Sequence, residues 1–193
     1  NSREWMDNIE SYFRDFFMPL VKKNLKPGDI LIHCGDVFDS RQSINLFVMN
    51  KGISIFEDLA EILPVYMIIG NHDIFMKSSN EINSLKVFKN NPRITVFEEP
   101  QKIQIGPRTA LMMPWRENHH AESEVLNNPA NFADLAFCHT DVKGFTFNKM
   151  QRIEEGNDAD TYSRYQMVYS GHIHWAQKFK NIRMLGSPYQ LTR

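Results

Sequence analysis

Long hydrophobic runs, cysteines and net charge are what this sequence of 193 residues has least of. No apolar run approaches the ~20 residues that a membrane-spanning helix requires, so we expect no membrane association. The two cysteines, Cys34 and Cys138, both end predicted core strands, which is typical of buried, reduced thiols and of an intracellular, cytoplasmic protein. The formal net charge of −1 gives no general attraction for nucleic acid, so contact with a polyanion would depend on local patches or on metal ions.

Four apolar stretches each run directly into polar residues that can bind a metal ion. A buried parallel strand has this pattern where it ends at a functional site, because the strand itself is hydrophobic on both faces. The stretches and the motifs after them are residues 30–34 with Gly35-Asp36-Val37-Phe38-Asp39, residues 65–69 with Gly70-Asn71-His72-Asp73, residues 135–138 with His139, and residues 167–170 with Gly171-His172-Ile173-His174. We therefore expect these polar residues to lie together.

The remaining segments predict an α/β protein. Apolar residues at helical spacing predict helices over residues 5–21, kinked at Pro19, and over residues 44–62, with Ser43 as the N-cap. Further elements are expected as helices over 80–88 and 117–126, strands over 94–97, 101–105, 108–113, 177–180 and 182–185, and a polar surface excursion over 141–164. Strands that alternate with helices, followed by a strand-rich half, indicate a two-sheet β-sandwich flanked by helices.

The residue types in the four motifs suit hard divalent metal ions. Such ions at hydrolytic sites bind carboxylate oxygen, amide oxygen and imidazole nitrogen. The candidate ligands are Asp36, Asn71, His139, His172 and His174. Two dications ~4 Å apart repel strongly and need an anionic ligand between them, and Asp36 is the candidate for that bridge.

His72 stands next to a candidate ligand and is placed to reach a substrate rather than a metal ion. We expect it to act as the general acid that protonates a departing oxygen. A second carboxylate should orient its ring, and Asp39 is the natural partner. Each motif taken alone has a structural explanation, since Gly-Asp-x-x-Asp is common in turns and helix caps and a histidine after a strand is often hydrogen-bonded in a core. The joint occurrence of the four motifs favours the metal site.

Together the four motifs resemble the second to fifth motifs of the calcineurin-like metallophosphoesterases, and the resemblance spans nearly the whole chain. It implies a four-layer αββα sandwich and a centre of two divalent ions, most often Mn²⁺, with Mg²⁺ as the alternative. Carried over to this sequence, Asn71, His139 and His172 would hold one ion, His174 would hold the other, and Asp36 would bridge them. His72 would be the acid, supported by Asp39.

The family's first motif, an Asp-x-His on the first strand, has no counterpart before the first predicted helix. We therefore expect residues 1–193 to be a metallophosphoesterase domain truncated at both ends, with its first strand and motif before Asn1. A capping domain and a partner-binding tail would follow Arg193. A site that has lost its first motif is the alternative.

Within that family, residues 171–177 and 185–191 resemble the SbcD-type nuclease subunits of bacteria and phages. This resemblance implies exonuclease and endonuclease cleavage of DNA phosphodiesters in double-strand break processing, recombination and repair. It also implies an SMC-like ATPase partner and a homodimer formed through the helices after the second and third motifs, roughly residues 44–62 and 80–88.

Two other functions fit the sequence. A phosphodiesterase acting on small nucleotides or other phosphoesters would suit the near-neutral charge, although residues 187–191 argue against it. A non-catalytic scaffold that binds DNA ends or the ATPase would suit an inactive metal site, and an intact Asp-x-His before Asn1 would disfavour it.

Overall fold

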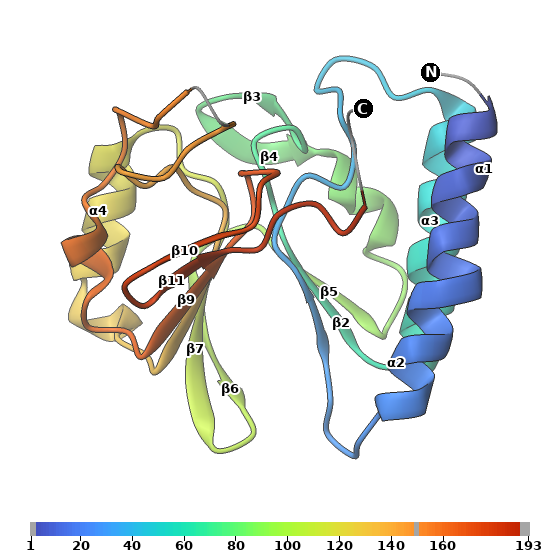
Figure 1. Ribbon diagram of the computed structural model, residues 1–193, viewed down its shortest axis with the longest axis horizontal. Coiled ribbons are helices and arrows are strands. Elements are labelled where there is room, and N and C mark those ends of the chain that lie inside the picture. The colour runs from blue at the N-terminus through green and yellow to red at the C-terminus, as the bar shows by residue number, and fades with distance from the viewer. Residues whose placement is uncertain (1–2, 149–150, 190–193) are drawn as a thin grey trace.

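Two β-sheets pack face to face with helices on their outer sides in the computed structural model, which describes residues 3–148 and 151–189 (Figure 1). Helices α1, α2 and α3 lie on one side of the molecule and α4 on the other (Figure 1). This is the α/β arrangement that the sequence predicted. Within the described part of the chain, no helix combines the length and the apolar character needed to cross a bilayer.

The first sheet has three parallel strands in the order β1-β2-β5. Its strands are β1 (Leu31–His33), β2 (Val65–Ile68) and β5 (Ile94–Phe97), and the helices that cover it are α1 (Arg3–Ser11), α2 (Met18–Asn24) and α3 (Leu46–Ile62). A π-helical turn, Tyr12–Phe17, joins α1 to α2 just before Pro19. Because proline has no N–H to donate, the predicted irregularity takes the form of this wider turn.

The second sheet has six strands in the order β10-β11-β9-β8-β7-β6. The strands are β6 (Gln101–Ile105), β7 (Arg108–Met113), β8 (Leu135–Cys138), β9 (Met167–Ser170), β10 (Gln177–Phe179) and β11 (Ile182–Met184). The four middle strands run parallel to one another. Each outer strand runs antiparallel to its neighbour, β10 to β11 and β6 to β7. The pairing of Ile105 with Arg108 confirms the predicted hairpin between β6 and β7.

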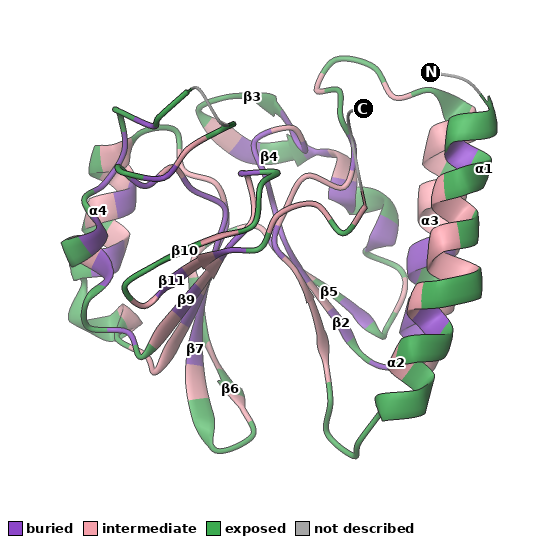
Figure 2. Cartoon of the chain, viewed as in Figure 1, coloured by how far each residue is buried: buried purple, intermediate pink, exposed green. Residues whose placement is uncertain are grey.

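Alternate residues of the buried strands contribute to different cores. On β2, Val65 and Met67 pack against the helices, whereas Ile68 faces the second sheet and shares a cluster with Met112 of β7. On β7, the neighbouring Met113 faces the opposite way, toward the core beneath α4 (His119–Asn127). Buried positions therefore run along the strands while the outer helix faces stay exposed (Figure 2). Burial on both faces explains why these strands are continuously hydrophobic.

The helix predicted over residues 80–88 is wrong. The segment instead contributes to an antiparallel pair of strands and a 3₁₀ turn, namely β3 (Ile74–Met76), β4 (Ser79–Asn83) and Ser84–Phe88. The side-chain amide of Asn80 donates to the Glu98 carbonyl at 2.8 Å, and that of Asn83 donates to the Asn80 carbonyl at 2.7 Å. Asparagine side chains that bond to the backbone in this way compete with helix formation, and here they outweigh the apolar spacing.

Two smaller expectations also need correction. The N-cap of α3 is Asn45, whose side-chain oxygen accepts the Phe47 N–H at 2.9 Å, rather than Ser43. The segment over residues 141–164 is more than a surface excursion, because its described part buries Val142 and Tyr162 in the core beneath α4. The apolar positions of this segment are separated by many charged residues, so they form no recognisable pattern in the sequence.

The last described residues return to the first helical segment. Tyr189 packs edge-on against Tyr12 and Phe13, with ring centroids 5.7 Å and 6.2 Å away. Part of the aromatic face of residues 12–17 is thus covered by the same chain. Gln190 and Leu191, which belong to the segment that resembles the nuclease subunits, lie outside the described residues.

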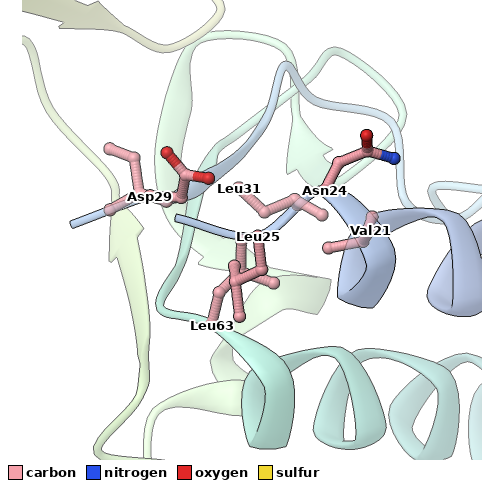
Figure 3. A pocket seen from close by; sticks show the side chains of 7 residues that line it. Val21, Asn24, Leu25, Asp29, Leu31 and Leu63 are labelled. Carbon is pink, nitrogen blue, oxygen red and sulfur yellow. The ribbon is translucent and has the colours of Figure 1, made fainter. Parts of the chain in front are cut away.

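An open groove of about 240 Å³ lies beside the amino end of β1 (Figure 3). The residues that line it are Val21, Asn24, Leu25, Asp29, Ile30, Leu31 and Leu63. This lining contains one carboxylate and no histidine. Because the candidate metal ligands follow the carboxyl ends of the strands, the groove lies at the other end of β1 and is not the predicted site.

Candidate metal centre

Four side-chain atoms from the four motifs converge where β1, β2, β8 and β9 end. They are Asp36 Oδ2, Asn71 Oδ1, His139 Nε2 and His172 Nδ1. His139 Nε2 lies 2.8 Å from Asn71 Oδ1 and 3.2 Å from Asp36 Oδ2. His172 Nδ1 lies 2.9 Å from Asn71 Oδ1 and 3.2 Å from His139 Nε2. Four of the five predicted ligands are therefore brought together.

The spacing of these atoms fits a divalent ion. A metal about 2.1 Å from each ligand, with right angles between them, places neighbouring ligand atoms about 3.0 Å apart. The separations in the site are 2.8–3.2 Å. Oxygen and nitrogen lone pairs that face one another this closely repel unless a cation or a proton lies between them. The residues present thus fit the metal that their chemistry implies.

The side chain of Asn71 could also lie the other way round. Turning its amide would let the NH₂ group donate to Asp36, His139 and His172, while its oxygen would accept from Arg41 Nη2 at 3.1 Å. That orientation suits a site without metal. The orientation with the oxygen inward is the one a metal requires, because an amide nitrogen offers no lone pair for coordination.

A contact between the two sheets orients His139. Its Nδ1 lies 2.7 Å from the Cys34 carbonyl oxygen, which can only accept, so Nδ1 carries the proton. The unprotonated Nε2 is then directed at the other ligands, as metal binding requires. Trp115 packs beside this ring and beside His172, with centroids 6.1 Å and 5.3 Å away. Nothing in the sequence pattern signalled that Trp115 would lie there.

Glycines let the strand ends approach closely enough to form the site. A Cβ atom on Gly171 would lie 2.1 Å from the Cys34 carbonyl oxygen, and one on Gly70 would lie 2.2 Å from Asp36 Oδ1. A Cβ on Gly35 would lie 2.4 Å from His139 Nδ1. Real side chains do not tolerate such distances, so the glycines before Asp36, Asn71 and His172 are a packing requirement.

Asp73 ties the first two motif loops together. Its carboxylate, only 2% exposed, accepts the N–H groups of Asp36, Val37 and Gly70 at 2.8–3.0 Å. Burial raises the pKa of Asp73 to about 6 despite these hydrogen bonds. The sequence pattern assigned Asp73 no role, although its place in the Asn71-His72-Asp73 motif is a usable signal.

Two of the converging residues have strained backbones. Asp36 has φ 59° and His172 has φ 71°, in the left-handed region that residues with a side chain rarely adopt. Strain of this kind costs roughly 1–3 kcal/mol and persists where surrounding contacts hold it in place. At both positions the strained residue directs its side chain at the other ligands.

The charges of Asp36 and His139 stabilise each other. Burial acts to raise the pKa of Asp36, but the contacts with His139 and with the His72 N–H outweigh it and lower the pKa to about 2. Burial likewise acts to lower the pKa of His139, and the Asp36 carboxylate reverses the direction and raises it. Protons therefore compete with a metal ion for His139, and the competition weakens as the pH rises.

His72 and Asp39 lie side by side, but not in the predicted way. The ring Nδ1 of His72 is 2.6 Å from the backbone carbonyl of Asp39, not from its carboxylate. The main-chain N–H of His72 donates to Asp36 Oδ1 at 2.8 Å. His72 is thus fixed beside the converging ligands without its ring being one of them.

His174 lies apart from the other candidate ligands. Its side chain is exposed, and its backbone carbonyl accepts the Ser187 N–H at 3.1 Å. Among the described residues, the acidic and histidine side chains grouped closely enough to hold an ion are Asp36, His139 and His172. The assignment of His174 to a second ion therefore stays a prediction.

A second buried carboxylate, Glu122 of α4, lies behind the site. It is 5% exposed and accepts hydrogen bonds from the hydroxyls of Tyr162 and Thr140, the latter at 2.6 Å. Thr140 directly follows His139, so this buried network adjoins the converging ligands. Burial raises the pKa of Glu122 from 4.5 to about 7.

We expect this burial to make the metal-free chain less stable as the pH rises. A carboxyl group whose pKa is raised on folding stabilises the fold fully below its unfolded pKa of 4.5, and that contribution is lost as the pH passes about 7. Glu122→Gln should remove the loss, which amounts to up to roughly 3 kcal/mol between pH 5 and pH 8. Urea unfolding at both pH values measures it. Glu124→Gln, on the exposed side of α4, is the control, and equal pH slopes for the two variants would show the expectation to be wrong.

Comparisons with known proteins agree with this geometry. A model of the calcineurin-like phosphoesterase family matches residues 5–183. Exonuclease subunit 1 of Enterobacteria phage T4 is 28% identical in an alignment that covers 98% of this chain and 56% of that protein. "Putative phosphoesterase 244L" of Invertebrate iridescent virus 6 is 27% identical, over 96% of this chain and 66% of that protein. "Putative phosphoesterase 078R" of Invertebrate iridescent virus 3 is 23% identical, over 92% and 52% respectively.

The chain spans between about half and two thirds of the length of these relatives. The similarity to a phage exonuclease subunit agrees with the resemblance to nuclease subunits that the motifs predicted. Since the family model matches nearly the whole chain, the predicted family is confirmed. This chain belongs to the calcineurin-like phosphoesterases.

Proposed function

We propose that this chain is the nuclease domain of a metal-dependent DNA nuclease, which hydrolyses phosphodiester bonds as an exonuclease and endonuclease in DNA end processing, recombination and repair. The observation that carries the proposal is the convergence of Asp36, Asn71, His139 and His172 in a chain similar over 98% of its length to a phage exonuclease subunit. When bound, divalent ions supply water activation and charge neutralisation at a phosphate group.

In this proposal, Asn71, His139 and His172 would hold one ion, His174 would hold a second, and Asp36 would be the ligand shared by both. The ions are Mn²⁺, with Mg²⁺ as the alternative. His72 is the general acid: with Nδ1 against the Asp39 carbonyl, its Nε2 is the ring nitrogen left to protonate the departing oxygen. Asp39 supports it through that carbonyl.

A second ion needs ligands besides Asp36 and His174, and we propose that an Asp-x-His strand before Asn1 supplies them. The exposure of β1 supports this proposal, because β1 lies at the edge of its sheet in the described part of the chain. All three residues of β1 are only half-buried, whereas three of the four residues of neighbouring β2 are buried. One more strand beside β1 would cover that edge. The capping domain and the partner-binding tail of the proposed nuclease follow Arg193.

The proposed partners are DNA, an SMC-like ATPase subunit and a second copy of this chain. Two aromatic residues of α3, the helix that the sequence favoured for the dimer, are already covered within the chain: Phe56 is buried and Phe47 lies beneath Arg3 and Lys51. Exposed apolar side chains on the β3–β4 pair suit an interface better. They are Phe75, Met76 and Ile82, which are 51–60% exposed.

A substrate panel tests the proposed function. The full-length protein with Mn²⁺ should cleave linear double-stranded and single-stranded DNA and should lose that cleavage on Asp36→Asn. Cleavage of small nucleotide diesters with no activity on DNA would instead support the phosphodiesterase alternative, which the near-neutral charge favours. DNA binding without any cleavage would support the non-catalytic scaffold.

A further inference from the structure

The two ring nitrogens of His172 face different surroundings. Nδ1 points at the other ligands, 2.9 Å from Asn71 Oδ1. Nε2 lies on the opposite side of the ring, 3.1 Å from Asp141 Oδ1. A neutral imidazole carries one proton, so the group that faces Nε2 decides whether Nδ1 is free to bind a metal.

We propose that Asp141 is the positioning residue for His172: its carboxylate accepts a hydrogen bond from Nε2–H and so keeps the proton on Nε2 and the Nδ1 lone pair directed into the metal site. This inference rests on the proposed metal site but concerns a residue that the four motifs do not include. Carboxylates that hold the second nitrogen of a metal-binding histidine fix both the tautomer and the orientation of the ring.

Among the surroundings of Asp141, His172 is the group that faces its buried carboxylate oxygen Oδ1. Oδ1 is buried and has no aligned hydrogen-bond partner in the described part of the chain, and His172 Nε2, 3.1 Å away, is the ring nitrogen that faces it. The distance suits a hydrogen bond, but the N–H is not aligned for one in this structure, so a small rotation of either side chain is needed to form it. The side chain of Asp141 is 18% exposed and that of His172 is 14% exposed, so water competes little for either group.

The backbone around Asp141 is held at two points. The Thr140 hydroxyl lies 3.2 Å from the Asp141 carbonyl oxygen and 2.6 Å from buried Glu122. Gly156, with φ +125°, packs against the same carbonyl, and a Cβ atom on it would lie 2.7 Å from that oxygen. A backbone bridge between Val142 and Asn157 also lies next to Asp141.

His172 needs such a partner because its own backbone does not hold it in a relaxed conformation. Its φ of 71° is strained, and its ring is otherwise held by Trp115 and Phe147, whose centroids lie 5.3 Å and 6.0 Å away. Aromatic packing restricts the ring but does not distinguish its two nitrogens. Asp141 makes that distinction.

Mn²⁺ affinity tests the proposal. We expect Asp141→Ala to weaken Mn²⁺ binding by about 10–100-fold in calorimetric titrations of this chain, which is the usual cost of losing such a partner. Asp141→Asn should lose less, because its amide oxygen still accepts the Nε2–H. The matched control is Asp158→Ala, a carboxylate of the same segment with a 73% exposed side chain, and it should bind Mn²⁺ within about twofold of the unmodified chain.

Nitrogen NMR of the His172 ring reports which of its two nitrogens carries the proton. A loss of packing alone would not change this. In the metal-free, unmodified chain Nε2 should carry the proton, and Asp141→Asn should shift the Nε2 signal while the Asp158 variant does not. This spectrum also decides the matter if Asp141→Ala does not fold. A proton on Nδ1 in the unmodified chain, or Asp141→Ala binding as tightly as Asp158→Ala, would overturn the assignment. Absence of Mn²⁺ binding in the unmodified chain would count against the proposed metal site instead. The NMR result would still show whether Asp141 holds the proton on His172 Nε2.

Discussion

His72→Asn should slow cleavage of a DNA oligonucleotide by about 10²–10⁴-fold while leaving metal binding nearly intact. This range is the usual contribution of a positioned general acid. The ring of His72 lies against the Asp39 carbonyl and outside the group of converging ligands, so its loss should not empty the site. The loss of rate should shrink for a p-nitrophenyl diester, because p-nitrophenolate leaves without needing a proton. The measurement compares both substrates at saturating Mn²⁺ in the full-length protein.

Equal losses on both substrates, together with weakened metal binding, would make His72 a ligand rather than the acid. Asp39 gives a second comparison. Because its backbone carbonyl makes the contact with His72, Asp39→Asn keeps that contact and should cost much less than His72→Asn. A defect as large as that of His72→Asn would show that the carboxylate contact expected from the sequence forms when substrate binds.

His139→Ala should abolish Mn²⁺ binding within the measurable range. Loss of a partner behind a ligand costs about 10–100-fold in affinity, and loss of the ligand itself should cost more. In the unmodified chain, Mn²⁺ at 100 times its dissociation constant should stabilise the fold by about 2.7 kcal/mol. The His139→Ala chain should show no such stabilisation in thermal unfolding followed with and without Mn²⁺.

His33→Ala is the matched control, because it also removes an imidazole from the end of a core strand. His33 packs edge-on against Phe56, and burial lowers its pKa to about 4. Its removal should lower the stability of the fold through lost packing but should leave the stabilisation by Mn²⁺ unchanged. If both variants lost that stabilisation equally, the effect would be a general loosening of the strand ends rather than the loss of a ligand.

The sequence predicted the centre of this molecule well because its signals there are local and strong. Buried parallel strands must be hydrophobic on both faces, and polar residues at their ends stand out against that background. This made Asp36, Asn71, His139 and His172 recognisable before their distances were known. The glycines before Asp36, Asn71 and His172 were equally visible, and the close contacts that a Cβ atom would make explain why they are there.

The errors arose where side chains override periodicity. Asn80 and Asn83 hydrogen-bond to backbone carbonyls and turn an expected helix into a strand. The roles of Trp115 and Asp141 depend on contacts across long stretches of sequence, which no spacing rule reports. The His72–Asp39 contact was predicted between the correct residues but through the wrong atoms, since a sequence does not say whether a carboxylate or its own carbonyl faces a neighbour.

Anomalous diffraction from crystals of this chain soaked in Mn²⁺ tests the central claim most directly. We predict a peak within coordination distance of Asp36 Oδ2, Asn71 Oδ1, His139 Nε2 and His172 Nδ1, with the Asn71 oxygen facing the ion. A second peak on the far side of Asp36 is expected to be weak unless the strand proposed beside β1 is present. No peak among the four atoms, or Mn²⁺ bound away from Asp36 with the Asn71 NH₂ group turned inward, would contradict the account.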